Sequence, residues 1–165
     1  MYKGTSASAG IGIGKAVIVE EAELVITRQA VSDGEAEIQR FKGALEQTIK
    51  DTERLAEDLA VRVGEKEAEI MKGHMMLLSD PMLTGEIENS IKNDGVNSEF
   101  AIENVCNMYA DMFASMGDEL MQQRATDMRD IKTRMQRVLM GIQSVDISSL
   151  PAGSILVAKD LTPSM

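Results

Sequence analysis

The single histidine and the single cysteine are the most reactive side chains in this sequence. His74 lies in residues 64–83, a stretch that also contains the densest run of methionine and leucine. At helical spacing this stretch has one apolar stripe, which is enough to hold a helix in a bundle, and a second stripe that includes His74. Met76 falls outside both stripes. The second stripe and the outward methionine suggest a face that meets a partner, but periodicity alone favours the alternative, a well-buried helix with irregular edges.

A glycine cluster and the cysteine also invite a chemical interpretation, but neither has the neighbours it would need. Residues 10–15 (Gly-Ile-Gly-Ile-Gly-Lys) approach a phosphate-binding loop, yet Ala9 replaces its first glycine and Ala16 its Ser/Thr. The dinucleotide-binding pattern fails because its third glycine comes one residue early. We expect these glycines to allow close backbone approach or bulges. Cys106 has no second cysteine for an intrachain disulfide, and we expect it at the edge of the core.

Composition limits the classes of protein that fit. The chain has 165 residues, 44% of them hydrophobic, which is enough for the core of one domain. Aromatic residues make up 3% and methionines number 13, so that core is aliphatic and rich in thioethers. The formal net charge of -10 disfavours nucleic acid and anionic lipid and favours a basic protein partner. With no signal peptide and no apolar run of about 18 residues, we expect a cytoplasmic protein.

Helical periodicity and capping signals predict a series of helices. The first covers residues 33–63 and begins with a capping box at Ser32 and Glu35. The others cover residues 65–78, a short stretch from Pro81 to Asp94, residues 98–116 and residues 118–141. Apolar residues of the first helix follow an alternating 3,4 spacing, which is the seam of an antiparallel bundle: Ile38, Phe41, Leu45, Thr48, Thr52, Leu55 and Leu59. On the two last helices the expected inward residues are Ala101, Val105, Met108, Met112, Met121, Ala125, Met128, Ile131, Met135, Val138 and Ile142.

The two ends of the chain have the shorter period of β-strands. Residues 16–19 (Ala-Val-Ile-Val) and residues 155–158 (Ile-Leu-Val-Ala) are predicted strands, each preceded by glycine-containing turn residues. Two strands alone make a marginal sheet, so this pattern indicates part of a larger α/β domain. The sequence therefore predicts a mainly α fold, an antiparallel helical bundle flanked by the short strands of an incomplete domain.

Four short motifs occur in one order along the whole chain. They lie at residues 6–16 (Ser-Ala-Ser-Ala-Gly-Ile-Gly-Ile-Gly-Lys-Ala), 73–78 (Gly-His-Met-Met-Leu-Leu), 124–131 (Arg-Ala-Thr-Asp-Met-Arg-Asp-Ile) and 157–164 (Val-Ala-Lys-Asp-Leu-Thr-Pro-Ser). Together with the helices between them, these motifs resemble the N-terminal part of Enzyme I of the phosphoenolpyruvate–sugar phosphotransferase system. Each motif alone is modest, but four in this order are specific.

This resemblance implies a helical domain inserted into an α/β swivelling domain. The α/β domain carries the family's phosphorylated histidine and would include residues 1–20 and 145–165. Residues 21–144 would form the insertion, which holds the small phosphocarrier protein HPr. The family takes a phosphoryl group from phosphoenolpyruvate onto that histidine and passes it to HPr. The histidine belongs to a Gly-Gly-x-x-Ser/Thr-His stretch that follows Leu-Thr-Pro-Ser, so we expect it beyond Met165 and do not assign it to His74.

The resemblance places the remaining chemistry of the family outside this sequence as well. Phosphoenolpyruvate and magnesium bind to the C-terminal barrel in the family, and the homodimer also forms through the C-terminal domain. We therefore expect no catalytic residue, cofactor or metal in these 165 residues. On this interpretation the chain belongs to a phosphotransferase, is inactive alone, and retains the surface that docks HPr.

The resemblance places the HPr contacts on the second, third and fifth helices, at Glu65, His74, Met76, Leu77, Leu83, Met121 and Arg124. HPr presents its histidine among apolar and basic residues, so a receptor needs apolar contacts surrounded by acids. A guanidinium binds a phosphoryl group or a carboxylate in a forked geometry, and we expect Arg124 to meet one of them. The alternative is an intrahelical pair of Arg124 with Asp127, which would leave guanidinium donors spare.

Two other functions fit parts of the pattern. The first is a fragment of another phosphoenolpyruvate-utilising enzyme with a swivelling domain, of the pyruvate phosphate dikinase or phosphoenolpyruvate synthase type. We do not expect those enzymes to carry this helical insertion with its Gly-His-Met-Met-Leu-Leu motif. The second is a purely structural helical bundle that serves self-association. Binding of HPr separates this last function from a docking module.

Overall fold

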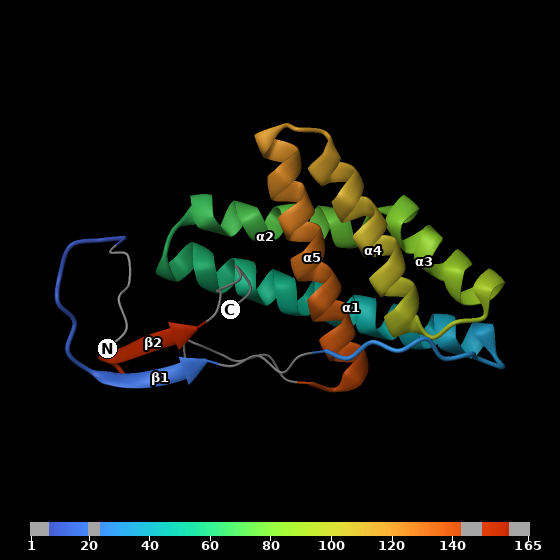
Figure 1. The fold of residues 1–165 in the computed structure, drawn as a ribbon, viewed down its shortest axis with the longest axis horizontal. Helices are drawn as coiled ribbons and strands as arrows, with labels where there is room; N and C mark the ends of the chain where they lie inside the picture. The colour runs from blue at the N-terminus through green and yellow to red at the C-terminus, as the bar shows by residue number, and fades with distance from the viewer. Residues whose placement is uncertain (1–6, 20–23, 143–149, 159–165) are drawn as a thin grey trace.

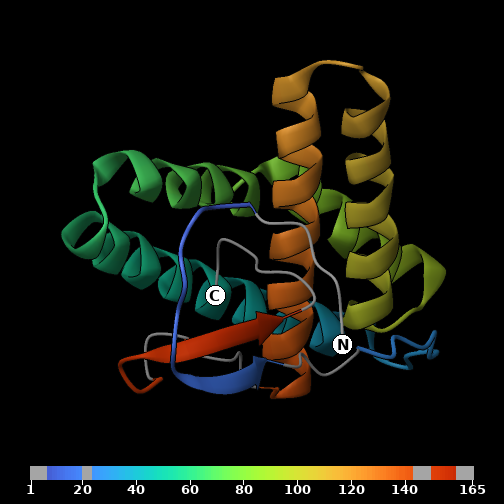
Figure 2. The ribbon, with the colours of Figure 1, turned by 60° about the vertical axis from the view of Figure 1, so that its left-hand side comes forward.

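The computed structural model describes residues 7–19, 24–142 and 150–158 of the chain. In these residues the helices are α1 (Gly34–Arg62), α2 (Glu65–Leu78), α3 (Pro81–Asp94), α4 (Ser98–Ser115) and α5 (Glu119–Met140), and the strands are β1 (Lys15–Val19) and β2 (Ser154–Ala158). The helices α1 and α2 run side by side, and the hairpin of α4 and α5 crosses them (Figures 1 and 2). The predicted helices are confirmed, most of their ends to within one residue.

Aspartate side chains begin three of the helices. Asp33, Asp80 and Asp118 each accept a hydrogen bond from a backbone N–H of the first turn, over 3.0, 2.8 and 3.2 Å. Each bond satisfies one of the N–H groups that the start of an α-helix leaves unpaired. The capping box predicted at Ser32 is therefore wrong by one residue, because the oxygen that bonds to the N–H of Ala36 belongs to Asp33.

The core lies where α1, α3, α4 and α5 meet. The predicted seam of α1 is buried at Ile38, Phe41 and two hydroxyl residues, Thr48 and Thr52. Its three leucines, Leu45, Leu55 and Leu59, are only half-buried, whereas Ala44 and Ala56 are buried beside the seam. The hydroxyls of Thr48 and Thr52 donate hydrogen bonds to the carbonyl oxygens of Ala44 and Thr48, over 2.8 and 2.6 Å, so burial leaves neither hydroxyl unpaired. The largest fully buried apolar side chains are Phe41, Met71, Leu78, Ile87, Ile91, Ile102, Met128, Ile131 and Met135.

The α4–α5 hairpin extends past α2, as Figure 2 shows. Part of the apolar surface of α4 is exposed. Met108 and Met112 were predicted to point inward but are 53% and 43% exposed, whereas Ala101 and Val105 on the same face are buried. The inward prediction is wrong for these two methionines. Periodicity defines which residues share a face, but it does not define how far a neighbouring helix covers that face.

The two strands pair with each other in parallel, although the helices separate them in the sequence. Lys15 lies opposite Ser154, and the register continues through the last residues of both strands. A Cβ at Gly14 would collide with the backbone carbonyl of Gly153, so the glycine before β1 is required for this close approach. The structural use predicted for the glycine cluster is confirmed at this position. The domain boundaries inferred from the resemblance stay predictions.

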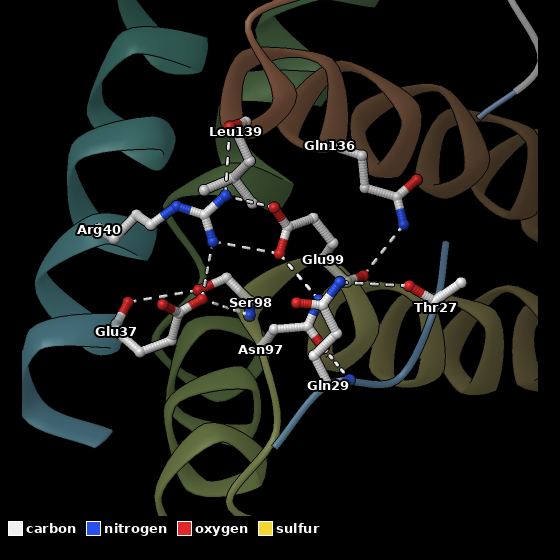
Figure 3. A network of polar contacts seen from close by, with 9 residues as sticks. All are labelled: Thr27, Gln29, Glu37, Arg40, Asn97, Ser98, Glu99, Gln136 and Leu139. Carbon is white, nitrogen blue, oxygen red and sulfur yellow. Dashed lines mark hydrogen bonds and ion pairs between the residues drawn. The ribbon is translucent and has the colours of Figure 1, made fainter. Parts of the chain in front are cut away.

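Arg40 joins the ends of three helices, as Figure 3 shows. Its guanidinium contacts Glu37 of α1, Glu99 at the start of α4 and the carbonyl oxygen of Leu139 near the end of α5. Burial opposes ionisation of Glu99, but hydrogen bonds from Arg40, from its own backbone N–H and from Asn97 outweigh this effect and lower its pKa. These contacts, termed the root network, tie the ends of α1, α4 and α5 together.

The segment that leads into the helices is bound beside the root network. The N–H of Gln29 donates to the side-chain oxygen of Asn97 over 2.9 Å, and the N–H of Asn97 donates to the carbonyl oxygen of Gln29 over 3.0 Å. Val31 adds a bond from its N–H to the carbonyl oxygen of Gly95 over 2.9 Å. The incoming chain is thereby fixed to the loop between α3 and α4.

We expect Asp33→Ala to lower the free energy of unfolding by about 1 kcal/mol, the usual effect of losing an N-cap. Ser32→Ala is the matched control and should change it by less than about 0.5 kcal/mol, because exposed residues outside a cap contribute little. Urea unfolding followed by far-UV circular dichroism measures both. A larger loss for Ser32→Ala would contradict the observed cap.

Candidate functional site

The single histidine of the chain lies at the crossing of α2 and α5. His74 is 0% exposed. Its Nε2 is 3.2 Å from a carboxylate oxygen of Asp127, and its Nδ1 is 3.5 Å from a carboxylate oxygen of Asp130. Burying polar groups is costly unless they meet partners, and here each ring nitrogen faces a carboxylate of α5. His74 therefore links α2 to α5 through polar contacts.

Two of the predicted HPr contacts lie inside the protein. His74 is fully buried, and Leu83 is 3% exposed and belongs to the main hydrophobic core. Neither side chain can touch a partner unless the helices separate. The direct contacts predicted for these two residues do not agree with their burial, and we replace them with structural roles.

The other five predicted contact residues have surface area that a partner could reach. Met76 is 72% exposed, and Glu65 is exposed near the start of α2. Leu77 and Met121 are half-buried. The side chain of Arg124 is 33% exposed. The rise of an α-helix places Glu65 about 12 Å along α2 from Gly73, so it lies apart from the crossing.

Arg124 lies against α2 at Gly73. A Cβ placed on Gly73 would be only 2.8 Å from Nη1 of Arg124. The same Nη1 is 3.7 Å from one carboxylate oxygen of Asp127, whose other oxygen faces His74. The intrahelical pair considered from the sequence is therefore present, but it is long. An arginine has five N–H donors, so this single contact leaves donors for a partner.

These positions define one surface around the crossing, which we term the docking face. Residues three or four apart on a helix are neighbours, so Met76 and Leu77 flank Gly73 on α2, and Leu120 and Met121 flank Arg124 on α5. Leu120 is 54% exposed and was not predicted from the sequence. Leu120 lies four residues before Arg124, so helical spacing in the sequence could have identified it as a neighbour of Arg124. The docking face consists of Met76, Leu77, Leu120, Met121 and Arg124.

Acidic residues adjoin the docking face. They are exposed on α2 and at the start of α5: Glu69, Asp118 and Glu119, with Glu65 farther along α2. With a formal net charge of -10 for the chain, they create a negative environment around apolar side chains. Such an arrangement suits a partner that presents apolar residues among basic ones, and it speeds the association of that partner.

A cavity of about 330 Å³ lies beside the root network, bordered by residues 25–31, Arg40, Glu99 and Met140. Its charged side chains already bind to one another, since Arg40 contacts Glu99 and Glu37. We therefore assign it to the joint between the incoming segment and the helices. In the described ranges no group of histidine, cysteine and acidic residues could hold a metal ion. No helix among the described residues is long and apolar enough to cross a membrane.

The fold defines a class of protein, the N-terminal domains of Enzyme I. A solved structure titled as the NMR solution structure of Enzyme I (nEIt) superposes with a TM-score of 0.89 at 38% identity, and the match covers 99% of this chain and 67% of that one. A second solved structure, the N-terminal domain of Enzyme 1 - Nitrogen, gives a TM-score of 0.72 at 25% identity, over 91% of this chain and 61% of that one.

Sequence comparison identifies the family. The family model described as "PEP-utilising enzyme, N-terminal" matches residues 3–124, and the chain belongs to this family. Relatives named phosphoenolpyruvate-protein phosphotransferase, from Bacillus subtilis (strain 168) and from Listeria monocytogenes, are each 39% identical over 162 residues. These matches cover 98% of this chain but only 28% of each relative. The resemblance to the Enzyme I family that the four motifs indicated is confirmed by this membership.

We expect Cys106 to resist alkylation in the folded protein. Burial raises the pKa of its thiol to about 12, so roughly one thiol in ten thousand is ionised at pH 8, and the thiolate is the reactive form. Iodoacetamide at pH 8, followed by mass spectrometry, should modify the folded chain at least about 100-fold more slowly than the urea-unfolded chain. Equal rates in the two states would show that the thiol is accessible and contradict this assignment.

Proposed function

We propose that the helical unit of this chain docks HPr, the small phosphocarrier protein of the phosphoenolpyruvate–sugar phosphotransferase system. One observation carries the proposal. Methionine and leucine side chains with exposed area lie one helical turn from Gly73 on α2 and one turn from Arg124 on α5, whose partly exposed guanidinium lies over Gly73. This surface belongs to a chain whose relatives are named phosphoenolpyruvate-protein phosphotransferases.

Each part of the docking face has a role in this proposal. Met76 and Leu77 provide apolar area that a partner removes from water, and the flexible thioether of methionine adapts to the partner's shape. Arg124 offers a forked pair of donors to a carboxylate or phosphoryl group of HPr. The neighbouring acids attract a basic partner and raise its association rate.

The whole protein has further activities in this proposal, and they belong to the part of the relatives that this chain does not cover. There a histidine receives the phosphoryl group from phosphoenolpyruvate, magnesium assists at the C-terminal domain, and two subunits associate through that domain in the cytoplasm. The present chain contributes recognition of HPr. His74 is not the phosphoryl carrier, because it is fully buried and both of its ring nitrogens face carboxylates.

The two other functions have less support. A pyruvate phosphate dikinase or phosphoenolpyruvate synthase type of enzyme agrees with the broad family model, but the named relatives that match 98% of this chain are phosphoenolpyruvate-protein phosphotransferases. A bundle that serves only self-association would have no use for a half-exposed arginine among apolar residues. Binding of HPr distinguishes these functions.

We expect Met76→Ser and Arg124→Ala each to weaken HPr binding by about tenfold or more, since anchoring residues at the centre of an interface carry most of its energy. Two matched controls remove the same residue types elsewhere: Met140→Ser, whose side chain is 40% exposed, and Arg129→Ala, whose side chain is 51% exposed. Both should retain the affinity of the parent. Isothermal titration calorimetry with purified HPr measures all four.

The position of the complex is tested separately by NMR. On addition of HPr, amide shifts should be confined to residues 65–83 and 118–128. The absence of any shift or heat of binding would reject the docking function and favour a structural bundle. Shifts centred on the root network would place the partner on a different surface.

A further inference from the structure

Gly73 lies in the interior of α2, directly beneath the guanidinium of Arg124. A Cβ placed on Gly73 would be 2.8 Å from Nη1 and 3.8 Å from Cζ of Arg124. Non-bonded heavy atoms approach favourably to about 3.5–4.0 Å, so a side chain at this position would displace the guanidinium. Apart from α2 itself, no other described residue has an atom within 4 Å of that Cβ. Arg124 alone therefore occupies the space above Gly73.

Glycine is unfavourable in a helix interior, because its backbone loses more freedom on folding than that of alanine. Gly43 of α1 and Gly85 of α3 show that helices of this chain contain glycine without a close neighbour, since a Cβ at either would meet nothing within 4 Å. Gly73 differs from them. The side chain that it lacks would collide with one identified group, the guanidinium of the docking face.

The residue after Gly73 fixes the other side of Arg124. His74 is fully buried and faces one oxygen of Asp127 at 3.2 Å, while the second oxygen of Asp127 lies 3.7 Å from Nη1 of Arg124. The opposite nitrogen of the ring, Nδ1, lies 3.5 Å from a carboxylate oxygen of Asp130 without forming a hydrogen bond. Asp127 is therefore anchored by a buried ring and cannot move away from Arg124 without breaking that contact. Because Gly73 has no side chain, the guanidinium can lie close to the backbone of α2. Asp127 limits how far the guanidinium can move along the surface of α5.

We propose that Gly73 and His74 are positioning residues that hold Arg124 ready for its partner without touching that partner. A long side chain loses rotamer freedom when an interface forms, and a guanidinium that is already held in place loses less. Affinity for the carrier then depends on two residues of α2 that lie under the docking face. This inference rests on the docking function proposed above and adds the reason why α2 carries Gly-His at the crossing.

Gly73→Ala tests the first half of the proposal in the 165-residue chain. The added methyl group displaces Arg124, and HPr binding measured by calorimetry should weaken about two- to tenfold, the factor that ordering one long side chain represents. Alanine favours the helix, so the melting temperature should not fall by more than about 2 °C. Gly43→Ala is the matched control and should bind HPr like the parent.

A double variant shows whether Gly73 acts through Arg124. If it does, Gly73→Ala combined with Arg124→Ala should bind HPr no more than about twofold more weakly than Arg124→Ala alone, because coupled residues are not additive. For His74 we use His74→Gln, which removes the ring that contacts Asp127 but keeps a polar side chain. In this variant the Nε–H NMR signal of Arg124 should shift and lose intensity. The affinity of this variant for HPr should fall about two- to tenfold, as expected for Gly73→Ala.

The outcomes separate the two proposals. Parent-like binding by Gly73→Ala together with weak binding by Arg124→Ala would overturn the positioning role and leave docking intact. Full additivity in the double variant would also overturn it, since Gly73 would then act independently of Arg124. An unchanged Arg124 signal and affinity in His74→Gln would remove His74 from the role. Parent-like binding by both Arg124→Ala and Met76→Ser would reject the docking function itself.

Discussion

The hydrogen-bond contact between the buried imidazole of His74 and the carboxylate of Asp127 is the interaction on which the arrangement of α2 and α5 depends. Asp127 and Asp130 lie three residues apart on α5, and each faces a different nitrogen of His74. Contacts between apolar side chains tolerate sliding, whereas a shift of α2 along α5 would separate the buried Nε2 of His74 from the carboxylate of Asp127. The cost of that separation is high in a protein interior, so the polar contact selects one register for the crossing.

The same register determines the surface above it. Gly73 directly precedes His74, and Arg124 lies one turn before Asp127, so pairing the buried residues also places the guanidinium over the glycine. The apolar neighbours of these two residues then come together from separate helices. An exposed surface is thus arranged by an interaction that no partner can reach, which explains how residues far apart in the sequence form one docking face.

Local patterns predicted most of the helices, because caps and spacing act within a few residues of the chain. Examples of such local patterns are the buried positions of the α1 seam and the N-caps of α3 and α5, at Asp80 and Asp118. The burial of His74 could not be predicted in the same way, since its partner Asp127 lies 53 residues later. Met108 and Met112 had the spacing of core residues, but no neighbouring helix covers them fully and both are partly exposed. The resemblance identified the relevant segments of the chain, whereas the depth of each side chain depends on tertiary packing.

The root network and the docking face lie at opposite ends of α5. From Leu139 to Arg124 the helix rises by about 22 Å, so a carrier at the docking face is remote from the joint that Arg40 forms with Glu99. Phosphoryl transfer requires reacting atoms within about 3–3.5 Å, and no residue of the docking face is a phosphoryl donor. In the proposed function the donor must therefore come to the carrier. Within this chain, the root network ties the far end of α5 to α1 and α4, and the His74–Asp127 contact ties α5 to α2 near the docking face, so the helix that carries Arg124 is held at two separate places.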